Sequence, residues 1–256
     1  MGAPHTSNSA AEVPPPAGEP RPSADELRTF MAQVLEEVGP RPSCSAAERA
    51  LGLRLEERWR ALGAHVAAEP FTCHPMAFLA SVPLFATGYL LAIPLAWAVP
   101  WLAVALMLSC ASAFVLELVR YREPLDPLFP AAQGVNVTAT FAPKGERRRR
   151  VILCAHQDSA WEFNLWHRLG NGSILLTAAA MCAWAVLLAS ALGRWGDWPA
   201  ASTLWWVSLG LAPLVAPFLF FHTFRAVPGA MDDLAGVAVL VGAGEALAKG
   251  TLELEQ

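Results

Sequence analysis

The sequence predicts an α/β fold, a partial sheet-and-helix domain interrupted by two helical hairpins that cross a membrane. The hairpins are predicted because apolar residues make up 55% of the 256 residues and charged residues only 16%, whereas about a quarter of a globular chain is charged. The domain is predicted because helical and strand patterns flank each apolar block. This composition excludes a freely soluble protein, a disordered protein and a small protein held by disulfides.

Residues 1–22 are rich in Pro, Ala, Gly and Ser, which is typical of a disordered leader. No basic segment followed by an apolar core occurs there, so we expect no cleavable signal peptide. Ordered structure is expected from Ser23, because Ser23 and Glu26 have the spacing of a capping box. The helix that follows has apolar residues at intervals of three and four and is expected to end near Gly39.

A second helix is expected from Ser45 to Gly63, since a serine favours a helix start and a glycine favours a helix end. Residues 65–71 then have the pattern of a short strand. Residues 23–75 are therefore predicted to form the first part of an α/β domain.

The first hairpin is predicted for residues 76–119. From Met76 to Leu116 the chain has 41 residues without an acidic or basic side chain, about twice the 20 residues that an α-helix needs to cross a bilayer. Pro94 and Pro100 bracket the expected turn. The two expected spans are residues 77–97 and 100–119.

The second hairpin is predicted for residues 172–224, with a turn at Arg194 and Asp197. Tryptophans surround both turns, as in the aromatic belts at membrane surfaces. Buried helices of a large soluble core are the alternative, but 256 residues are too few to cover apolar runs of this length. Pro213 and Pro217 are expected to kink the last span. The two expected spans are residues 172–193 and 203–223.

Because each hairpin returns the chain to the side it left, residues 1–75, 120–171 and 225–256 are expected to share one face of the membrane. These segments contain 17 of the 18 Lys and Arg residues, and only Arg194 lies at a hairpin tip. Lys and Arg favour the cytoplasmic side, so we expect the domain on the cytoplasmic face of an integral, multi-pass membrane protein.

The remaining charges and cysteines exclude other classes. The net charge is −4, and the basic tract 147–150 is interpreted as a solvated turn, so we expect no nucleic-acid partner. The five cysteines are scattered and include no CxxC pair, which indicates neither a disulfide framework nor a zinc ribbon.

Residues 120–171 contain two predicted strands, 134–141 and 151–155, and the second is apolar throughout, as in a buried parallel sheet. His156 and Asp158 follow it and point the same way because they are two residues apart. They lie at the carboxyl end of the strand, where α/β sheets bind ligands. A histidine beside a carboxylate suits a metal ligand or a general base; an N-cap Asp with an incidental His is the alternative.

In residues 225–256, Asp232 and Asp233 precede a predicted helix over 237–248. Adjacent carboxylates at a helix start are explained by N-capping and by the helix dipole. In combination with His156 and Asp158, a metal-binding role becomes the stronger interpretation.

These segments together resemble the co-catalytic zinc peptidases of family M twenty-eight, which include leucyl aminopeptidases, glutamate carboxypeptidases and non-catalytic relatives such as the transferrin receptor ectodomain. Gly39-Pro40-Arg41 also resembles a motif near the start of that fold. The resemblance covers roughly residues 25–75, 131–160 and 227–250. Its motifs are Asn136-Val137, the run from Val151 to Ser159 and the run from Pro228 to Leu240.

The resemblance implies a role for each residue of the motifs. His156 would bind one zinc ion, Asp158 would orient His156 as a catalytic residue, and Asp232 would bridge two zinc ions. Asp233 would follow across a peptide bond that is often cis in relatives. The expected reaction is aminopeptidase-type hydrolysis of a peptide substrate by a metal-activated water.

The sequence departs from the family in two ways. First, Asp232 lies 74 positions after Asp158 (232 − 158), and a membrane hairpin fills this stretch. The hairpins are therefore expected to be insertions that leave the sheet intact and place the site near the bilayer. Second, the family's Glu-Glu pair, further Asp and second His do not follow, and neither Glu253 nor Glu255 is assigned to them. We therefore expect the chain to be the N-terminal part of a longer enzyme.

Three alternatives to a membrane zinc peptidase remain at this point. A non-catalytic scaffold or receptor could keep the fold without the site. A transporter is weaker, because ionisable residues usually mark ion pathways and none was identified inside the spans. A glutaminyl-cyclase-like transferase would share the fold. Relatives are frequently secreted or lumenal, which opposes the cytoplasmic face that the charges predict, and the substrate side chain and oligomeric state are not indicated.

Overall fold

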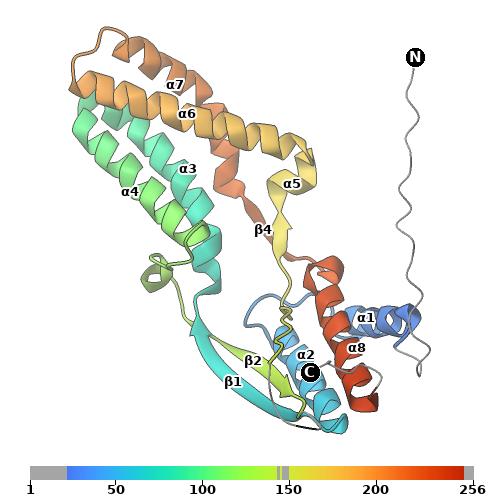
Figure 1. The fold of residues 1–256 in the computed structure, drawn as a ribbon. Coiled ribbons are helices and arrows are strands. Elements are labelled where there is room, and N and C mark those ends of the chain that lie inside the picture. The colour runs from blue at the N-terminus through green and yellow to red at the C-terminus, as the bar shows by residue number, and fades with distance from the viewer. Residues whose placement is uncertain (1–21, 143–144, 146–149, 251–256) are drawn as a thin grey trace, which may run out of the picture.

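The computed structural model describes residues 22–142, 145 and 150–250. The predictions for the leader, for most of the arginine tract and for Glu253 and Glu255 fall outside these residues. The chain is mostly helical, with a few short strands. Figure 1 shows the apolar helices gathered at one end of the molecule and the helices from both ends of the described chain, with the longest strands, at the other.

The first part of the chain folds as expected, with the predicted strand extended by two residues. Ser23 caps the first helix: its Oγ accepts a hydrogen bond from Glu26 N (3.2 Å), and the Glu26 carboxylate accepts one from Ser23 N (2.6 Å). This reciprocal pair is the predicted capping box. Ser45 caps the second helix in the same manner, through Glu48 N. The elements are α1 (Ala24–Glu37), α2 (Ala46–Ala61) and β1 (His65–Cys73).

Four helices are long and apolar enough to cross a membrane, and they form the two predicted hairpins. Their ends fall within a few residues of the prediction, except that the last α-helix stops at Val215 and not near residue 223. A short 3-10 helix with Pro217 in its first turn follows, and then the chain becomes extended. The elements are α3 (Pro75–Ala98), α4 (Pro100–Leu118), α6 (Gly172–Trp195), α7 (Ala201–Val215) and η2 (Ala216–Phe220).

One acidic residue, Glu117, lies inside the predicted spans, in the last turn of α4, which corrects the expectation that none does. Its side chain is buried and accepts a hydrogen bond from Leu125 N (3.3 Å). Glu117 therefore stabilises the turn that follows α4. This structural role explains the residue, so Glu117 does not support the transporter interpretation.

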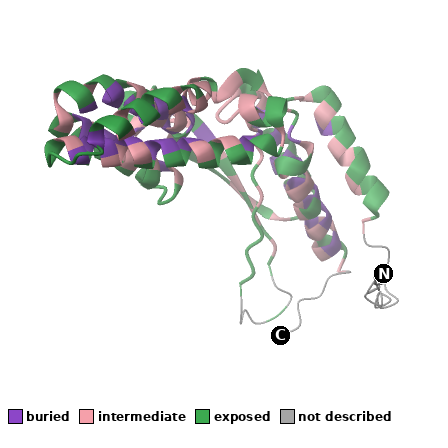
Figure 2. Cartoon of the chain, turned by 90° about the horizontal axis from the view of Figure 1, so that it is seen from above, coloured by how far each residue is buried: buried purple, intermediate pink, exposed green. Residues whose placement is uncertain are grey.

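The four long helices share one apolar core, in which Phe85 and Trp184 stack with ring centres 3.9 Å apart. Two polar side chains bond backbone carbonyls of neighbouring helices: Tyr89 Oη donates to Ser208 O (2.7 Å) and Trp205 Nε1 to Ile93 O (2.7 Å). Such bonds satisfy polar groups that have no water partner inside a bilayer. Figure 2 shows buried residues on the inward faces of this bundle.

Arg194 joins the tips of the two hairpins. Its guanidinium donates to Ala96 O (2.9 Å) and Trp97 O (3.0 Å) at the end of α3. It also lies over the Trp97 ring, 4.0 Å from the ring centre, an arrangement in which the ring face attracts the cation. Both hairpin tips therefore lie at the same end of the bundle.

Two small antiparallel sheets connect the bundle to the other end of the molecule. β1 pairs along its whole length with β2, from His65 opposite Thr140 to Cys73 opposite Ala132. β3 pairs with β4 between the site and the second hairpin. The remaining elements are β2 (Ala132–Thr140), β3 (Trp161–Phe163), β4 (His222–Ala226), α5 (Asn164–Leu169), η1 (Asp126–Leu128), η3 (Ala230–Leu234) and α8 (Ala235–Lys249).

The predicted strand over residues 151–155 is wrong for the described part of the chain. These residues pair with no described strand, and Val151, Ile152 and Leu153 are 60%, 71% and 56% exposed. A buried parallel strand needs hydrogen-bonded neighbours, and here β2 bonds β1 while no described strand pairs with residues 151–155, of which only Ala155 packs against the core. The α/β character is thus limited to two-stranded antiparallel sheets among the described residues.

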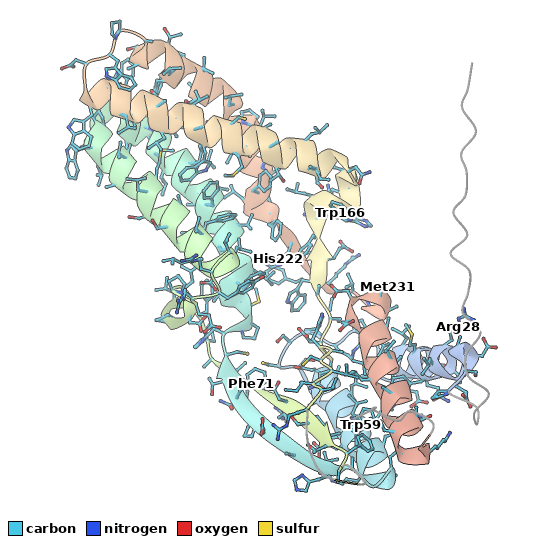
Figure 3. The ribbon with its side chains drawn as sticks, viewed as in Figure 1. Arg28, Trp59, Phe71, Trp166, His222 and Met231 are labelled. Atoms are coloured by element: carbon cyan, nitrogen blue, oxygen red, sulfur yellow. The ribbon has the colours of Figure 1, made fainter. Side chains whose placement is uncertain are left out.

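A second core holds α1, α2 and α8 together beneath the site. Leu51, Val34 and Val241 are buried there, each at most 2% exposed. Trp59, labelled in Figure 3, lies against α8 at Gly244. This core positions α8, whose first residues follow Asp232 and Asp233.

Candidate functional site

The candidate site lies where the segment after residue 155 meets the start of α8. His156 and Asp158 lie in irregular backbone, and Asp232 lies in the turn η3 that leads into α8. The 73 residues between Asp158 and Asp232 contain β3, α5, the second hairpin and β4, yet the fold brings both ends of this insertion together. His156, Asp158, Asp232 and Asp233 are all within this one cluster.

The imidazole of His156 contacts a carboxylate through each of its nitrogens. Nδ1 lies 2.9 Å from Asp158 Oδ1, and Nε2 lies 3.0 Å from Asp232 Oδ1. The side chains of His156 and Asp232 are 53% and 77% exposed and that of Asp158 is 32% exposed. The cluster is therefore open to solvent on the Asp232 side and more enclosed around Asp158.

The two carboxylates favour the protonated form of the imidazole. Burial is the largest single influence and lowers the pKa of His156, but hydrogen bonds and charges of Asp158 and Asp232 together raise it above its ordinary value. The two carboxylates therefore move the titration of the His156 imidazole to higher pH.

Asp233 fixes the backbone of the cluster. Its Oδ2 accepts a hydrogen bond from His156 N (3.2 Å), and its Oδ1 accepts one from Gly236 N (3.1 Å) in the first turn of α8. The peptide bond between Asp232 and Asp233 is cis. The helix-capping explanation, considered for both carboxylates, therefore describes Asp233, while Asp232 faces His156.

No protein-family model, curated protein or solved structure matches this chain.

The likeness to the zinc peptidases consequently rests on the motifs and on the geometry of the cluster itself.

Arg41 is a central residue of the site to which the sequence analysis assigned no role. It is fully buried, and its guanidinium donates to Gln157 O (2.9 Å), to Gly39 O (2.8 Å) and to Gly229 O (3.4 Å). Its backbone adds two bonds to Ser159, one from Arg41 N to Ser159 Oγ (2.8 Å) and one from Ser159 N to Arg41 O (2.7 Å). One residue thus links the loop before α2 to both motif segments.

Two opposing influences act on the pKa of the buried Arg41 side chain. Burial lowers the pKa of Arg41, and the nearby Asp158 carboxylate opposes this change. The sequence did contain a sign that Arg41 is special. It lies between Pro40 and Pro42 in a turn, so it cannot be explained as a charged residue on the solvent-exposed face of a helix. The bonding partners, 116 and 188 positions away, are given only by the structure.

Gly229 makes the close approach of these segments possible. Its φ is +66°, and a β-carbon there would lie 2.6 Å from Ser159 Cβ and 2.9 Å from Asp232 O. A side chain at this position would therefore separate the His156 segment from the Asp232 turn.

His156 Nε2 and Asp232 Oδ1 could both bind one zinc ion. Two ligands that each lie about 2.0–2.1 Å from a tetrahedral zinc ion are about 3.3–3.4 Å apart, close to the observed 3.0 Å. Asp158 contacts His156 Nδ1, the nitrogen opposite the proposed ligand atom, where a carboxylate orients the imidazole in carboxylate–histidine–zinc arrangements. Among the described residues, however, no three His, Cys, Asp or Glu side chains converge in the geometry of a metal site.

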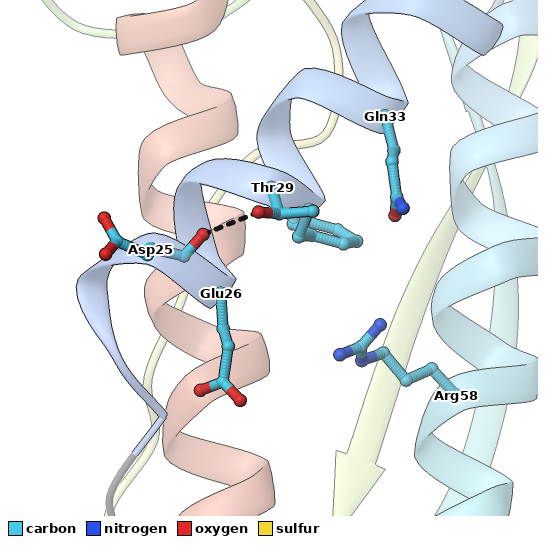
Figure 4. A pocket seen from close by; sticks show the side chains of 6 residues that line it. Asp25, Glu26, Thr29, Gln33 and Arg58 are labelled. Atoms are coloured by element: carbon cyan, nitrogen blue, oxygen red, sulfur yellow. Dashed lines mark hydrogen bonds between the residues drawn. The ribbon is translucent and has the colours of Figure 1, made fainter.

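A pocket of about 340 Å³ lies elsewhere, between α1 and α2. Figure 4 shows Arg58 on one side of it and Glu26 and Gln33 on the other. It shares no residue with the cluster around His156 and is open to solvent, so it does not extend the candidate site.

Proposed function

We propose that this chain carries the metal-binding part of a membrane-anchored zinc peptidase, with His156 and Asp232 as zinc ligands and Asp158 as the residue that orients His156. The observation that supports this proposal is the contact chain from Asp158 through His156 to Asp232. An incidental histidine next to Asp158 has no reason to meet Asp232 as well, across an insertion of 73 residues, whereas a metal site requires this convergence.

Each residue has a defined part in the proposed chemistry. Zinc, when bound, would supply the Lewis acid that acidifies a water molecule and polarises a peptide carbonyl. Asp158 accepts the Nδ1 proton of the neutral imidazole, which leaves the Nε2 lone pair directed at the ligand position beside Asp232. The Asp232 carboxylate has two oxygens, so it can bind one ion beside His156 and reach a second.

The proposed reaction needs more groups than the described residues supply. A general base and further ligands are required to hold two ions and to take a proton from water. In the family that the motifs resemble, the general base and the further ligands are supplied by a Glu-Glu pair, an Asp and a His. We therefore assign to this chain the first two ligands and the membrane anchor, and propose peptide hydrolysis for the protein that combines them with the remaining groups.

The two hairpins anchor the site on one side of the bilayer, because they leave and return at the same end. We propose that this side is cytoplasmic, since Arg120, Arg122, Arg168 and Arg225 flank the spans there, against Arg194 alone at the tips.

Zinc binding by the full chain in detergent tests the proposal. After chelator treatment and dialysis against zinc, we expect bound metal in the unaltered chain and its loss in His156→Ala and Asp232→Asn. Asp158→Asn should weaken binding by about 10–100-fold, the usual effect of removing a residue that orients a histidine ligand. His65→Ala is the matched control, because His65 is exposed at the start of β1, outside the cluster.

Retention of zinc by His156→Ala at the affinity of the unaltered chain would contradict the ligand assignment. A non-catalytic scaffold is the second candidate, and it is favoured by the lack of a three-ligand group among the described residues. No zinc bound at micromolar concentration by the unaltered chain would support that candidate. Aminopeptidase activity on aminoacyl nitroanilides, in the protein that contains the remaining ligands, separates the two.

A further inference from the structure

Two cysteines outside the candidate site lie in contact with each other. Cys44 is in the loop between α1 and α2, Cys73 is the last residue of β1, and their sulfur atoms are 3.0 Å apart. All five cysteines lie among the described residues, and only this pair is in contact. No local sequence pattern marks Cys44 and Cys73 as a pair, because the two residues are 29 positions apart.

We propose that Cys44 and Cys73 are an oxidisable pair that forms an intramolecular disulfide. The sulfur atoms must approach by about 1 Å to reach the bond length of about 2.05 Å. This movement is small, and the backbone on both sides already directs the two thiols toward each other.

The loop holds Cys44 in position through Glu48. Cys44 has a φ of +61°, a conformation that residues with a side chain rarely adopt. Its backbone N–H donates to the buried Glu48 carboxylate, which belongs to the first turn of α2. Cys73 is held by the β1–β2 pairing opposite Ala132. Both thiols are therefore attached to ordered elements.

The order of the chemical steps follows from the environment of Cys73. Burial, together with the hydrogen bond and charge of Cys44, raises the pKa of Cys73 to about 12 and disfavours its thiolate, so Cys44 reacts first. The Cys44 thiolate attacks a small-molecule disulfide such as oxidised glutathione, breaks its sulfur–sulfur bond and releases one glutathione thiolate.

Cys73 closes the protein disulfide in the second step. It gives its proton to solvent, its sulfur attacks the Cys44 sulfur of the mixed disulfide, and the second glutathione thiolate leaves. The two released thiolates take up the two protons. Two protein thiols are oxidised by two electrons, and one oxidised glutathione is reduced to two molecules of glutathione.

The bond would join the site loop to the membrane anchor. Cys44 follows Arg41 by three residues, and Cys73 precedes α3 by two. The disulfide would connect the loop that holds both motif segments directly to the start of the first span. This inference is independent of the proposed zinc chemistry, because neither sulfur belongs to the cluster around His156.

Counting free thiols in the purified full chain tests the proposal. The exposed Cys154 would itself react with glutathione, so the parent for this test is Cys154→Ala, which has four thiols. Cys182 is also exposed, but it lies inside the span α6, where detergent shields it from glutathione. After equilibration with oxidised glutathione, acid quenching and denaturation, a maleimide-polyethylene glycol reagent labels each remaining thiol. We expect two labels on the oxidised parent, four after reduction with dithiothreitol, and a Cys44–Cys73 linked peptide by mass spectrometry.

Two further variants serve as controls. In the same background, Cys44→Ser should keep its three labels, and Cys110→Ser, which retains the pair, should fall from three to one. Four labels on the parent at every glutathione ratio would overturn the proposal. Loss of a single label, which means a stable mixed disulfide with glutathione, or loss of two labels in Cys44→Ser would overturn it as well.

Discussion

At the scale of single residues, the site depends on a few polar groups that each bind several segments. Asp233 bonds the His156 backbone and the start of α8, and Arg41 bonds both motif segments and its own loop. Such groups can be positioning residues without contacting a substrate, because they fix the separation between His156 and Asp232.

Arg41→Gln should destabilise the chain and loosen the site. The variant loses the three guanidinium bonds and leaves buried carbonyl groups without a donor, which costs about 2–4 kcal/mol. We expect a lower unfolding temperature in detergent and weaker zinc binding than in the unaltered chain.

Arg28→Gln provides the comparison for this prediction. Arg28, labelled in Figure 3, has a side chain that is 77% exposed and pairs only with Asp25, so its loss should change stability by less than about 0.5 kcal/mol. Equal effects of the two substitutions would show that Arg41 does not hold the motif segments together.

The sequence identified some site residues and missed others for physical reasons. His156, Asp158 and Asp232 stand in local patterns, namely the end of an apolar run and the start of a helix, so they could be predicted. The N-capping bond of Asp233 to Gly236 N is local and was predicted, but the bonds of Arg41 to Gln157 O and of His156 N to Asp233 span 116 and 77 positions. No local pattern encodes those contacts.

At the scale of elements, helices were predicted well because their ends carry local signals. Ser23 and Ser45 are N-caps, and charges and prolines delimit the spans. The strand predicted over residues 151–155 was wrong, because a strand is defined by a partner and an apolar run does not specify one. The strand predicted over residues 134–141 was confirmed as β2, which has β1 as its partner.

Helix α8 should be sensitive to side-chain size at Gly244. A β-carbon there would lie 2.1 Å from the Trp59 ring, so Gly244→Ala forces α8 and α2 apart. Overpacking of this kind costs about 1–3 kcal/mol, and each kcal/mol lowers the unfolding temperature by about 2–4 °C in a chain of this size.

The control is Gly210→Ala in α7, where no atom lies within 4 Å of the new β-carbon. Alanine is the better helix former, so its unfolding temperature should stay the same or rise slightly. If Gly244→Ala is equally well tolerated in thermal unfolding, α8 does not pack on Trp59 as described.

At the scale of the whole molecule, the bundle lies at one end and the core of α1, α2 and α8 at the other, and the start of α8 lies between them, next to β4 (Figure 1). Arg194 ties the hairpin tips together at one end, and the second core holds α1, α2 and α8 at the other. The division into a membrane bundle and a separate domain could be predicted from the uncharged runs alone. The contact of Arg194 with the other hairpin could not, and it was found only in the structure.

Topology reporters attached to the domain and to a hairpin tip should show that these two parts lie on opposite sides of the membrane. A reporter fused at Gln256 should be active in the cytoplasm, and one inserted at Asp197, in the tip of the second hairpin, should be active only outside it. The reverse pattern would place the domain on the other face. Activity of both reporters on one side would contradict the hairpins themselves.

The direct passage of β1 into α3 sets an upper limit on the height of the site above the lipid. Gln157 donates to Val135 O, and Val135 pairs with Pro70, five residues before the first span begins at Pro75. Five extended residues reach at most about 18 Å, and the path to the site adds the spacing of about 5 Å between paired strands and the length of the Gln157 side chain. A folded substrate of 100 residues has a radius of gyration of about 13 Å, so it would meet lipid headgroups while approaching. For the proposed peptidase, this geometry would favour short peptides, or flexible chain ends lying along the bilayer, over compact proteins as substrates.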